Sequence, residues 1–444
     1  MSRMLSSGRQ AQGSGAENRR PLGRRDFGTG AFVAHAAQRE SDGASQAQHV
    51  YEVERGLVRR FLRALGDPPI EIVLWDGQAI GSGVGPPVAR VHLRDRRALL
   101  KLIVHPELNF GDGYVAGRIE VEGDLLRMLE AVYRASAKAG APGPVRRRAA
   151  LWLRRTRANT LAGSRNNIYH HYDIGDDFYR LWLDREMVYT CGYFPDAETT
   201  LDAAQLAKME HVCRKLWLNP GETVVEAGCG WGGLALYMAR HFGVTVKAFN
   251  VSKEQIKHAQ ARARQEGMQS RITFIEDDYR NIAGRYDVFV SVGMLEHVGP
   301  EHYDELGDVV DRCLGPDGRG LIHSIGRDSP GIMNAWIERR IFPGAYPPSL
   351  REMLTMLEPR QFSVLDVENL RLHYAQTLRH WLARFDAAAE RVAAMFDEPF
   401  VRAWRLYLTG SIAAFTMGSL QLFQVLFARA GMNDIPATRE HLYR

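Results

Sequence analysis

The chain has 444 residues, of which 45% are hydrophobic and 25% charged, as in a globular protein large enough for more than one domain. Its 57 basic and 52 acidic residues leave a formal net charge of +5, which argues against a nucleic-acid-binding protein. The four cysteines, at positions 191, 213, 229 and 313, have the spacing of neither a zinc site nor a disulfide framework, so we expect a protein of the reducing cytoplasm.

The amino-terminal part of the chain changes character near residue 46. Residues 1–45 are rich in Gly, Ser, Ala, Gln and Arg and have little apolar periodicity, which predicts a disordered tail. The arginine pairs at 19–20 and 24–25 precede a segment too short and too polar for the core of an export signal. Residues 46–140 predict a small α+β domain, with a helix near 58–65, strands at 70–75 and 89–93, and a further helix that starts near residue 124.

A basic linker is predicted at 141–165, after the Gly- and Pro-rich residues 140–144. Its arginines and apolar residues together suit an anionic membrane surface, and a solvated helix face explains them equally well. The residues concerned are Arg146, Arg147, Arg148, Arg154, Arg155 and Arg157, with Leu151, Trp152 and Leu153 among them.

Residues 166–435 predict a domain of the α/β class. Short apolar runs alternate there with helical patterns, which indicates a parallel sheet flanked by helices, with strands at 223–226, 245–249, 272–275, 286–290 and 320–323. Residues 406–428 carry no charge, but polar residues interrupt them, so we expect a buried helix and a buried strand in place of a membrane span. Ligands of such sheets bind outside the carboxyl ends of the strands, where polar residues become the candidates.

A glycine-rich turn follows the first of these strands. Gly228, Gly230, Gly232 and Gly233 leave the backbone bare, so that a ligand can approach the amide groups of the next helix. The spacing lacks the third glycine of the dinucleotide pattern and suits S-adenosylmethionine better. A tight strand-to-helix turn without a ligand is the plain alternative.

Polar residues also follow the second and third strands. Asn250 and Gln255 are the groups available for ribose hydroxyls, while Ser252 is expected to cap the next helix. The tetrapeptide Asp277-Asp278-Tyr279-Arg280 offers an acceptor for an adenine amino group and a flat side chain beside the ring, and otherwise is a plain acidic turn.

The fourth and fifth strands are followed by a carboxylate and an imidazole. Glu296 lies in an otherwise apolar stretch, where a buried acid needs a partner or a task. His323 occupies the corresponding position of the next strand. An isolated histidine is more often structural, but an acid and a histidine at adjacent strand ends favour a functional site.

Six motifs resemble those of the cyclopropane-fatty-acyl-phospholipid synthase family of S-adenosylmethionine-dependent enzymes, and they follow the family's order. The resemblance covers about residues 51–431. The resemblance implies a Rossmann-like class I methyltransferase sheet with a smaller amino-terminal α+β domain, associated with lipid or substrate. That extra domain favours the phospholipid-modifying branch over shorter relatives that act on carrier-bound mycolic precursors. The motifs are Tyr172-Asp173-Ile174-Gly175 with Phe178-Tyr179, Tyr189-Thr190-Cys191-Gly192-Tyr193-Phe194, Glu226-Ala227-Gly228-Cys229-Gly230-Trp231-Gly232-Gly233, Gly293-Met294-Leu295-Glu296-His297-Val298-Gly299, His323-Ser324-Ile325-Gly326 and His373-Tyr374-Ala375-Gln376-Thr377-Leu378.

The resemblance implies that the π electrons of a cis alkene attack the activated methyl group, and that a bound bicarbonate takes the proton lost as a cyclopropane ring closes. It implies a cage for bicarbonate made of Glu296, His323 and Tyr374 with backbone groups of Cys191 and Ile325, and no metal. Cys191 is therefore not taken as a nucleophile. The expected cofactor residues are Tyr189, Thr190, Glu226, Gly228, Cys229, Gly230, Gly232, Asn250, Val251, Gln255, Tyr279, Arg280 and Val292.

One departure from the family is Ser411, which stands where well-known members often carry a cysteine and argues against an essential thiol there. We expect an enzyme that adds a methylene group to unsaturated acyl chains of membrane phospholipids, in the cytoplasm and peripherally at the inner face of the membrane. The alternative is a fatty-acyl C-methyltransferase that gives a methyl or methylene branch. No nucleic-acid partner is expected, and a homodimer is left open.

Two readings from other classes fit less well. A non-catalytic lipid-binding protein would require a degenerate cofactor site, against the intact Glu296, His323 and Tyr374. A methyltransferase acting on small molecules or nucleic acid explains the sheet but neither the amino-terminal domain nor the motif around Tyr374.

Overall fold

The computed structural model describes residues 52–138 and 174–443. The predicted tail at 1–45 and the predicted basic linker at 141–165 lie outside the described residues, and so does the start of the first motif, Tyr172-Asp173.

Residues 52–138 contain a four-stranded sheet in the order β2-β1-β3-β4, in which β1 and β3 are parallel and the other pairs are antiparallel. The elements are α2 (Glu52–Ala64), β1 (Ile70–Val73), β2 (Ala79–Gly81), β3 (Ala89–Leu93), α3 (Arg96–Val104), α4 (Pro106–Val115), β4 (Ile119–Gly123) and α5 (Leu125–Lys138).

Two strands of this sheet were not predicted from the sequence, β2 and β4. β2 has only three residues, of which Ile80 alone is buried. In β4, Glu120 and Glu122 alternate with the inward residues and pair across to β3, where Glu122 lies 2.8 Å from His92 and Glu120 contacts Arg94. Acidic residues are rare in strands, and here the cross-strand pairs stabilise the strand.

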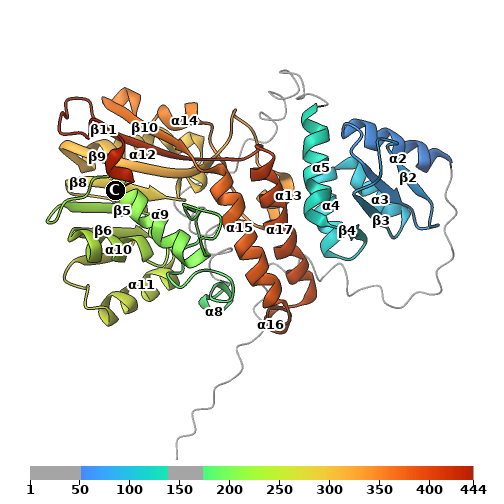
Figure 1. Ribbon diagram of the computed structural model, residues 1–444, viewed down its shortest axis with the longest axis horizontal. Coiled ribbons are helices and arrows are strands. Elements are labelled where there is room, and N and C mark those ends of the chain that lie inside the picture. Colours follow the sequence, from blue (N-terminus) through green and yellow to red (C-terminus); the bar gives the residue numbers. More distant parts are fainter. Residues whose placement is uncertain (1–51, 139–173, 444) are drawn as a thin grey trace, which may run out of the picture. The chain divides into compact units, whose positions relative to one another are not determined.

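Residues 174–443 contain a seven-stranded sheet in the order β10-β11-β9-β8-β5-β6-β7 (Figure 1). The five strands from β9 to β7 are parallel, and β11 and β10 add an antiparallel edge. The strands are β5 (Thr223–Ala227), β6 (Thr245–Asn250), β7 (Ile272–Glu276), β8 (Tyr286–Val292), β9 (Leu314–Gly326), β10 (Phe362–Asn369) and β11 (Gln421–Arg429). The predicted α/β class is confirmed, while β10 was not predicted.

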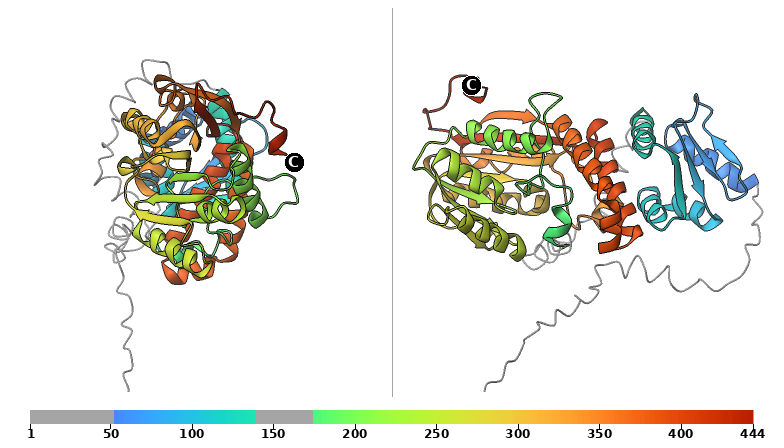
Figure 2. Two further views of the ribbon diagram at one scale, coloured as in Figure 1. Left: turned by 90° about the vertical axis from the view of Figure 1, so that its left-hand side faces the viewer. Right: turned by 60° about the horizontal axis from the view of Figure 1, so that its bottom comes forward.

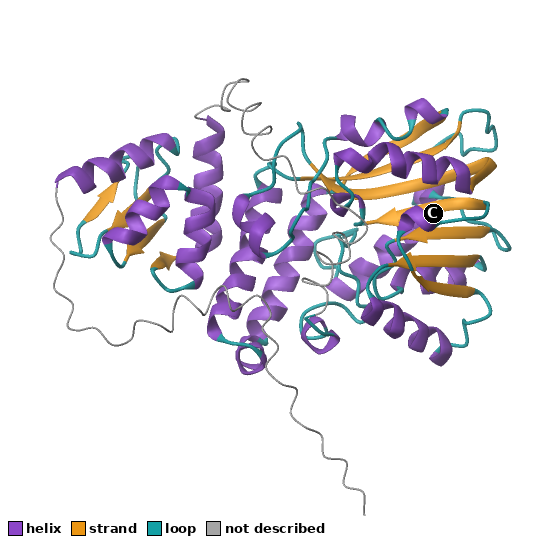
Figure 3. Ribbon diagram, turned by 180° about the vertical axis from the view of Figure 1, so that it is seen from behind, coloured by secondary structure: helices purple, strands orange, loops and turns teal. Residues whose placement is uncertain are grey.

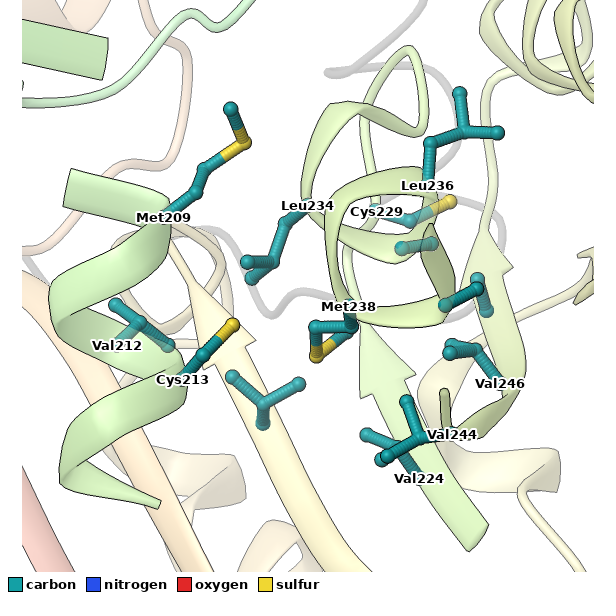
Figure 4. Packing of buried hydrophobic residues seen from close by; sticks show 14 of the residues in the cluster. Met209, Val212, Cys213, Val224, Cys229, Leu234, Leu236, Met238, Val244 and Val246 are labelled. Carbon is teal, nitrogen blue, oxygen red and sulfur yellow. The ribbon is translucent and has the colours of Figure 1, made fainter. Parts of the chain in front are cut away.

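Helices cover both faces of the large sheet (Figure 3). Successive residues of a strand point to opposite faces, and accordingly Val224 packs with α9, α10 and α11 while Val225 packs with α12 and α14. In Figure 4, Met209 and Cys213 of α9 face Leu234 and Met238 of α10 above β5. The α-helices from residue 174 to 354 are α8 (Asp176–Tyr179), α9 (Leu201–Lys215), α10 (Gly233–Phe242), α11 (Lys253–Gln265), α12 (Tyr303–Cys313), α13 (Ala335–Arg340) and α14 (Leu350–Leu354).

The carboxyl-terminal helices α15 (Arg371–Ala387) and α17 (Glu398–Thr416) lie side by side, joined by α16 (Ala389–Met395) (Figure 2). α17 and the following β11 are largely buried, which confirms the predicted helix and strand in the uncharged stretch. No helix within the described ranges is long and apolar enough to cross a membrane.

Candidate active site

The glycine turn after β5 has left-handed backbone at three of its glycines. Gly228, Gly230 and Gly232 have φ angles of 86°, 53° and 84°. A Cβ on Gly232 would lie 2.7 Å from the ring of Phe274, so this position has to be glycine. At Gly230, leaving aside its chain neighbours, no heavy atom among the described residues lies within 4 Å of the place a Cβ would take. The backbone at Gly230 is therefore bare.

The amide side chains after β6 lie beside this turn. Asn250 Nδ2 donates to Gln255 Oε1 at 2.7 Å and points to the carbonyl of Gly230 at 3.4 Å, and its Oδ1 accepts from the backbone N of Val251 at 2.9 Å. Ser252 caps α11, as predicted, through the backbone N of Gln255. The structure thus brings the predicted residues Asn250, Val251 and Gln255 to the glycine turn.

The tetrapeptide after β7 forms a short 3-10 helix, η1 (Tyr279–Asn281). Asp278 is buried and caps η1 through the backbone N of Arg280 at 3.0 Å, and it pairs with the Arg280 guanidinium at 3.3 Å. Asp278 is thus held by its own helix. The guanidinium of Arg280 lies 5.0 Å from the centre of the Tyr279 ring, which leaves a flat, cationic pair at this strand end.

Residues 189–190 are held by α9 and α17. The Tyr189 and Tyr407 hydroxyls are 2.9 Å apart. Thr190 accepts from Lys208 Nζ at its Oγ1 (3.1 Å) and from Gln205 Nε2 at its carbonyl (2.7 Å). Burial lowers the pKa of Lys208 to about 8, a shift opposed by the charge of Asp184.

Glu226, the second-last residue of β5, is a buried acid, with 2% of its surface exposed. Burial raises the pKa of its carboxyl to about 8, and the Lys208 ammonium opposes this rise. Its Oε2 has no hydrogen-bond partner within the part of the chain that the structure describes. A buried polar atom in this condition is costly, which marks it as a position for a ligand's donor.

Glu296 contacts the backbone of β9, and His323 belongs to this strand. Glu296, in the 3-10 helix η2 (Leu295–His297), accepts from the backbone N of Ile325 at 2.6 Å through Oε1. His323 Nδ1 lies 3.1 Å from Gln424 Nε2 of β11. Glu296 Oε2 and His323 Nε2 are both buried without a hydrogen-bond partner among residues 52–138 and 174–443.

The electrostatics of these two groups follow from their burial. Burial raises the pKa of Glu296 to about 7, although the Ile325 amide opposes the rise. Burial also holds the pKa of His323 well below its usual value, so this imidazole is neutral. Because Gln424 donates to Nδ1 as placed, the neutral ring carries its proton on Nε2. Among the described residues, Glu296 thus presents an unpartnered acceptor oxygen and His323 an unpartnered N–H donor.

Cys191 and Tyr374 both approach the carbonyl of Leu370, just before α15. The Leu370 carbonyl accepts from the backbone N of Tyr374 at 3.1 Å and lies 3.9 Å from Cys191 Sγ. Burial raises the pKa of the Cys191 thiol, which keeps it protonated and agrees with the prediction that it is no nucleophile. The same helix holds the 191–194 loop, because Thr377 Oγ1 accepts from Gly192 N and His373 Nδ1 accepts from Phe194 N, both at 3.0 Å.

The register of β8 against β9 brings a predicted cofactor residue next to a residue of the predicted bicarbonate cage. Val292, a predicted cofactor residue, is paired with His323 across β8 and β9, and Gly293 N donates to the His323 carbonyl at 2.8 Å. Tyr279 and Arg280 follow β7, at the far edge of the sheet from β9. Within the described ranges, no group of three or more His, Cys, Asp or Glu side chains is arranged to hold a metal ion.

Several residues of the site were not predicted from the sequence, chiefly Lys208, Gln205 and Tyr407. The signal for Lys208 was present: with Leu201, Ala204 and Val212 it falls on one stripe of α9, so a lysine occupies an apolar position. A buried lysine needs a partner or a task, as a buried glutamate does. For Tyr407 the contact with Tyr189 joins residues far apart in sequence, which no local pattern predicts.

Two family models match parts of the chain. A family model described as mycolic acid cyclopropane synthetase matches residues 160–425. A second family model, described only as a domain of unknown function, matches residues 57–140.

Individual relatives cover most of the chain. It is 35% identical to a "Probable fatty acid methyltransferase" of Pseudomonas putida over 85% of this chain and 96% of the relative. It is 42% identical to the cyclopropane-fatty-acyl-phospholipid synthase of Escherichia coli K12 over 61% of this chain and 69% of the relative.

A solved structure, mycolic acid cyclopropane synthase CmaA1 complexed with SAH and CTAB, superposes with a TM-score of 0.57 at 30% identity and covers 60% of this chain and 98% of that one. The fold, the glycine turn and these matches together identify the chain as a member of the mycolic acid cyclopropane synthetase family, with a Rossmann-like class I methyltransferase sheet.

Proposed function

We propose that this protein transfers a methylene group from S-adenosylmethionine to the cis double bond of unsaturated acyl chains in membrane phospholipids, closing a cyclopropane ring. The observation that carries the proposal is that Glu296 Oε2, an acceptor, and His323 Nε2, a donor, are both buried without partners in the described part of the chain. Family membership supports the reaction class.

The residues at the strand ends fit S-adenosylmethionine. Gly230 offers bare backbone, Glu226 offers an unpartnered oxygen to a cationic amino group, and Asn250 and Gln255 lie where a ribose would bind. The flat Tyr279–Arg280 pair suits an adenine ring. When bound, the sulfonium supplies an electrophilic carbon without a metal.

The Glu296–His323 pair fits bicarbonate. Its hydroxyl would donate to Glu296 Oε2, and one of its other oxygens would accept from the His323 N–H, so both buried atoms gain a partner. The backbone N–H of Ile325 holds the Glu296 carboxyl in place, and the side chain of Gln424 holds the His323 ring. When bound, bicarbonate supplies the acceptor for the proton that ring closure releases.

The surroundings of Tyr374 and Tyr189 favour a reaction that must exclude water. Tyr374 is 7% exposed. The centre of its ring lies 4.7 Å from that of Phe415 and 5.9 Å from that of Trp381. The ring centres of Trp381 and Tyr189 lie 5.3 Å apart. Aromatic walls suit an acyl chain and protect an electron-deficient carbon from solvent.

The phospholipid substrate is supported by the Escherichia coli relative, whose printed name states it. We propose that the protein meets this substrate peripherally, at the inner face of the membrane.

A second candidate is a fatty-acyl C-methyltransferase, favoured by the relative from Pseudomonas putida that covers 85% of the chain. The test is to incubate the purified protein with S-adenosylmethionine and vesicles of cis-unsaturated phospholipid, and to analyse released acyl chains by mass spectrometry and proton NMR. Upfield ring protons with loss of the alkene signal establish the synthase. Added mass without ring protons assigns the branching reaction, and no added mass refutes the proposal.

A further inference from the structure

Helix α8 contacts the glycine turn without belonging to the proposed chemistry. Its first residue, Asp176, accepts from Trp231 Nε1 through Oδ1 and from His258 Nδ1 through Oδ2, each at 2.8 Å. Trp231 lies within the glycine turn and His258 lies on α11. A single carboxylate thus joins three segments around the candidate cofactor site.

Trp231 is the one large side chain of the turn, set between Gly230 and Gly232. Its indole is 3% exposed and lies 5.0 Å from the Tyr179 ring of α8. Gly230 and Gly232 have left-handed backbone. A free loop with these glycines would adopt many other conformations as well. Asp176 holds the indole N–H and Tyr179 contacts its ring, so the indole is fixed. The backbone of the flanking glycines is fixed with it.

α8 also reaches the second segment proposed to hold the cofactor. Tyr179 contacts the ring of Tyr189 at 5.5 Å, one residue before Thr190. Hydrogen bonds from His258 and Trp231 hold the pKa of Asp176 below its usual value, although partial burial opposes this, so the acceptor is a carboxylate. Charge-assisted hydrogen bonds of this kind are the stronger ones.

We propose that Asp176 is a positioning residue for the cofactor: through the Trp231 indole and His258 it holds the glycine turn in the shape that binds S-adenosylmethionine. The inference rests on the proposed function, because it assigns the cofactor to this turn. Asp176 touches no reacting group in the proposed reaction, and its effect passes through Trp231.

The test is the binding of S-adenosylhomocysteine to the full chain by isothermal titration calorimetry. Asp176→Ala should weaken binding about tenfold or more, the range for a lost hydrogen bond to a charged group. Trp231→Phe removes the donor of the same bond and should weaken binding to a similar extent. The double variant should lose little beyond Asp176→Ala, because that change already breaks the bond to Trp231.

The chain offers a matched control in Asp177, the next residue of α8. Its side chain is 87% exposed and pairs with Arg180. Asp177→Asn should change the dissociation constant by less than twofold. Asp176→Asn keeps the shape and one acceptor and should fall between the wild type and Asp176→Ala, which covers the case that the alanine variant does not fold.

A positioning role also predicts how turnover changes. In Asp176→Asn the KM for S-adenosylmethionine should rise while kcat at saturation stays within about threefold of the wild type. Wild-type affinity in Asp176→Ala, or fully additive losses in the double variant, would overturn the inference. A wild type that binds no S-adenosylhomocysteine would overturn the proposed function and this inference together.

Discussion

The two ends of the large sheet treat buried polar groups in opposite ways. At the amino end, Arg319 of β9 is 2% exposed, and its donors reach both oxygens of Glu222 at 2.8 and 2.9 Å and the carbonyls of Leu216 and Trp217 at 2.5 and 3.1 Å. At the carboxyl end, Glu226, Glu296 and His323 each keep a buried atom without a partner among the described residues.

The difference separates polar groups that stabilise the fold from those kept for a ligand. A buried charge whose donors are all paired lowers the stability of the fold much less than an unpaired one. Removing one partner of such a pair lowers the stability strongly. An unpaired buried atom lowers stability, so its persistence at one end of the sheet indicates function there. Substitutions at the two ends should accordingly affect different measurements.

The largest effect is expected from Arg319→Met. It removes the ion pair with Glu222 and the bonds to the Leu216 and Trp217 carbonyls, and should lower the free energy of unfolding by about 3–5 kcal/mol, measured by urea denaturation. Affinity for S-adenosylhomocysteine should be unchanged in the folded fraction. Arg285→Met, at an exposed arginine, is the control. A loss of affinity with unchanged stability would refute the contrast between the two ends.

Glu296→Gln should do the reverse. It removes the acceptor proposed to hold the base, so kcat should fall about a hundredfold while affinity for S-adenosylhomocysteine and the melting temperature remain or rise slightly. The control is Glu301→Gln, at a nearby exposed acid, which should keep full turnover. Unchanged turnover in Glu296→Gln would exclude the proposed role of this residue.

Two glycines of the same turn should separate folding from binding. Gly232→Ala places a Cβ 2.7 Å from Phe274 and should cost about 2–3 kcal/mol of stability. Gly230→Ala meets open space and should cost about 1 kcal/mol, yet weaken S-adenosylhomocysteine binding about tenfold.

Gly267 is the matched control for this pair. Its φ is 69°, and no heavy atom of the described residues lies within 4 Å of its Cβ position. Gly267→Ala should therefore reproduce the backbone cost of Gly230→Ala and leave binding unchanged. If Gly230→Ala binds as tightly as Gly267→Ala, the bare backbone at residue 230 has no part in cofactor binding.

The smallest effect concerns the pH dependence of stability through Glu226. Burial raises its pKa from 4.5 to about 8, so between these values the folded protein holds a proton that the unfolded chain has released. The free energy of unfolding therefore falls as pH rises through this window. Glu226→Gln removes this term and should gain about 1–2 kcal/mol over the wild type between pH 5 and 8.

Denaturation of both proteins across pH 5 to 9 measures this difference, which should level off above about pH 8. Glu276→Gln, at an exposed acid that ends β7, should give a difference that does not vary with pH. A constant difference for Glu226→Gln as well would mean that Glu226 ionises in the folded protein as it does in the unfolded chain.

The sequence predicted the parts of the molecule that local patterns determine. β5 to β8 follow from short apolar runs, and Glu296 stood out as an acid in an apolar stretch. The Gln424 that orients His323 could not be predicted, because it depends on the register of β11 against β9, about a hundred residues apart. β4 was missed because Glu120 and Glu122, which pair with residues of the β3 segment, are rare in strands and hide the alternation of Ile119 and Val121.

The position of β11 also decides when this site can form during synthesis. The last strand of the chain is an interior strand, inserted between β9 and β10, which are made earlier. Until the ribosome releases residues 421–429, the nascent sheet exposes two open edges, and His323 has no Gln424 beside it. A chain made only as far as β10 therefore has the glycine turn without an oriented imidazole, and the surroundings of His323 are complete only after β11 has been made.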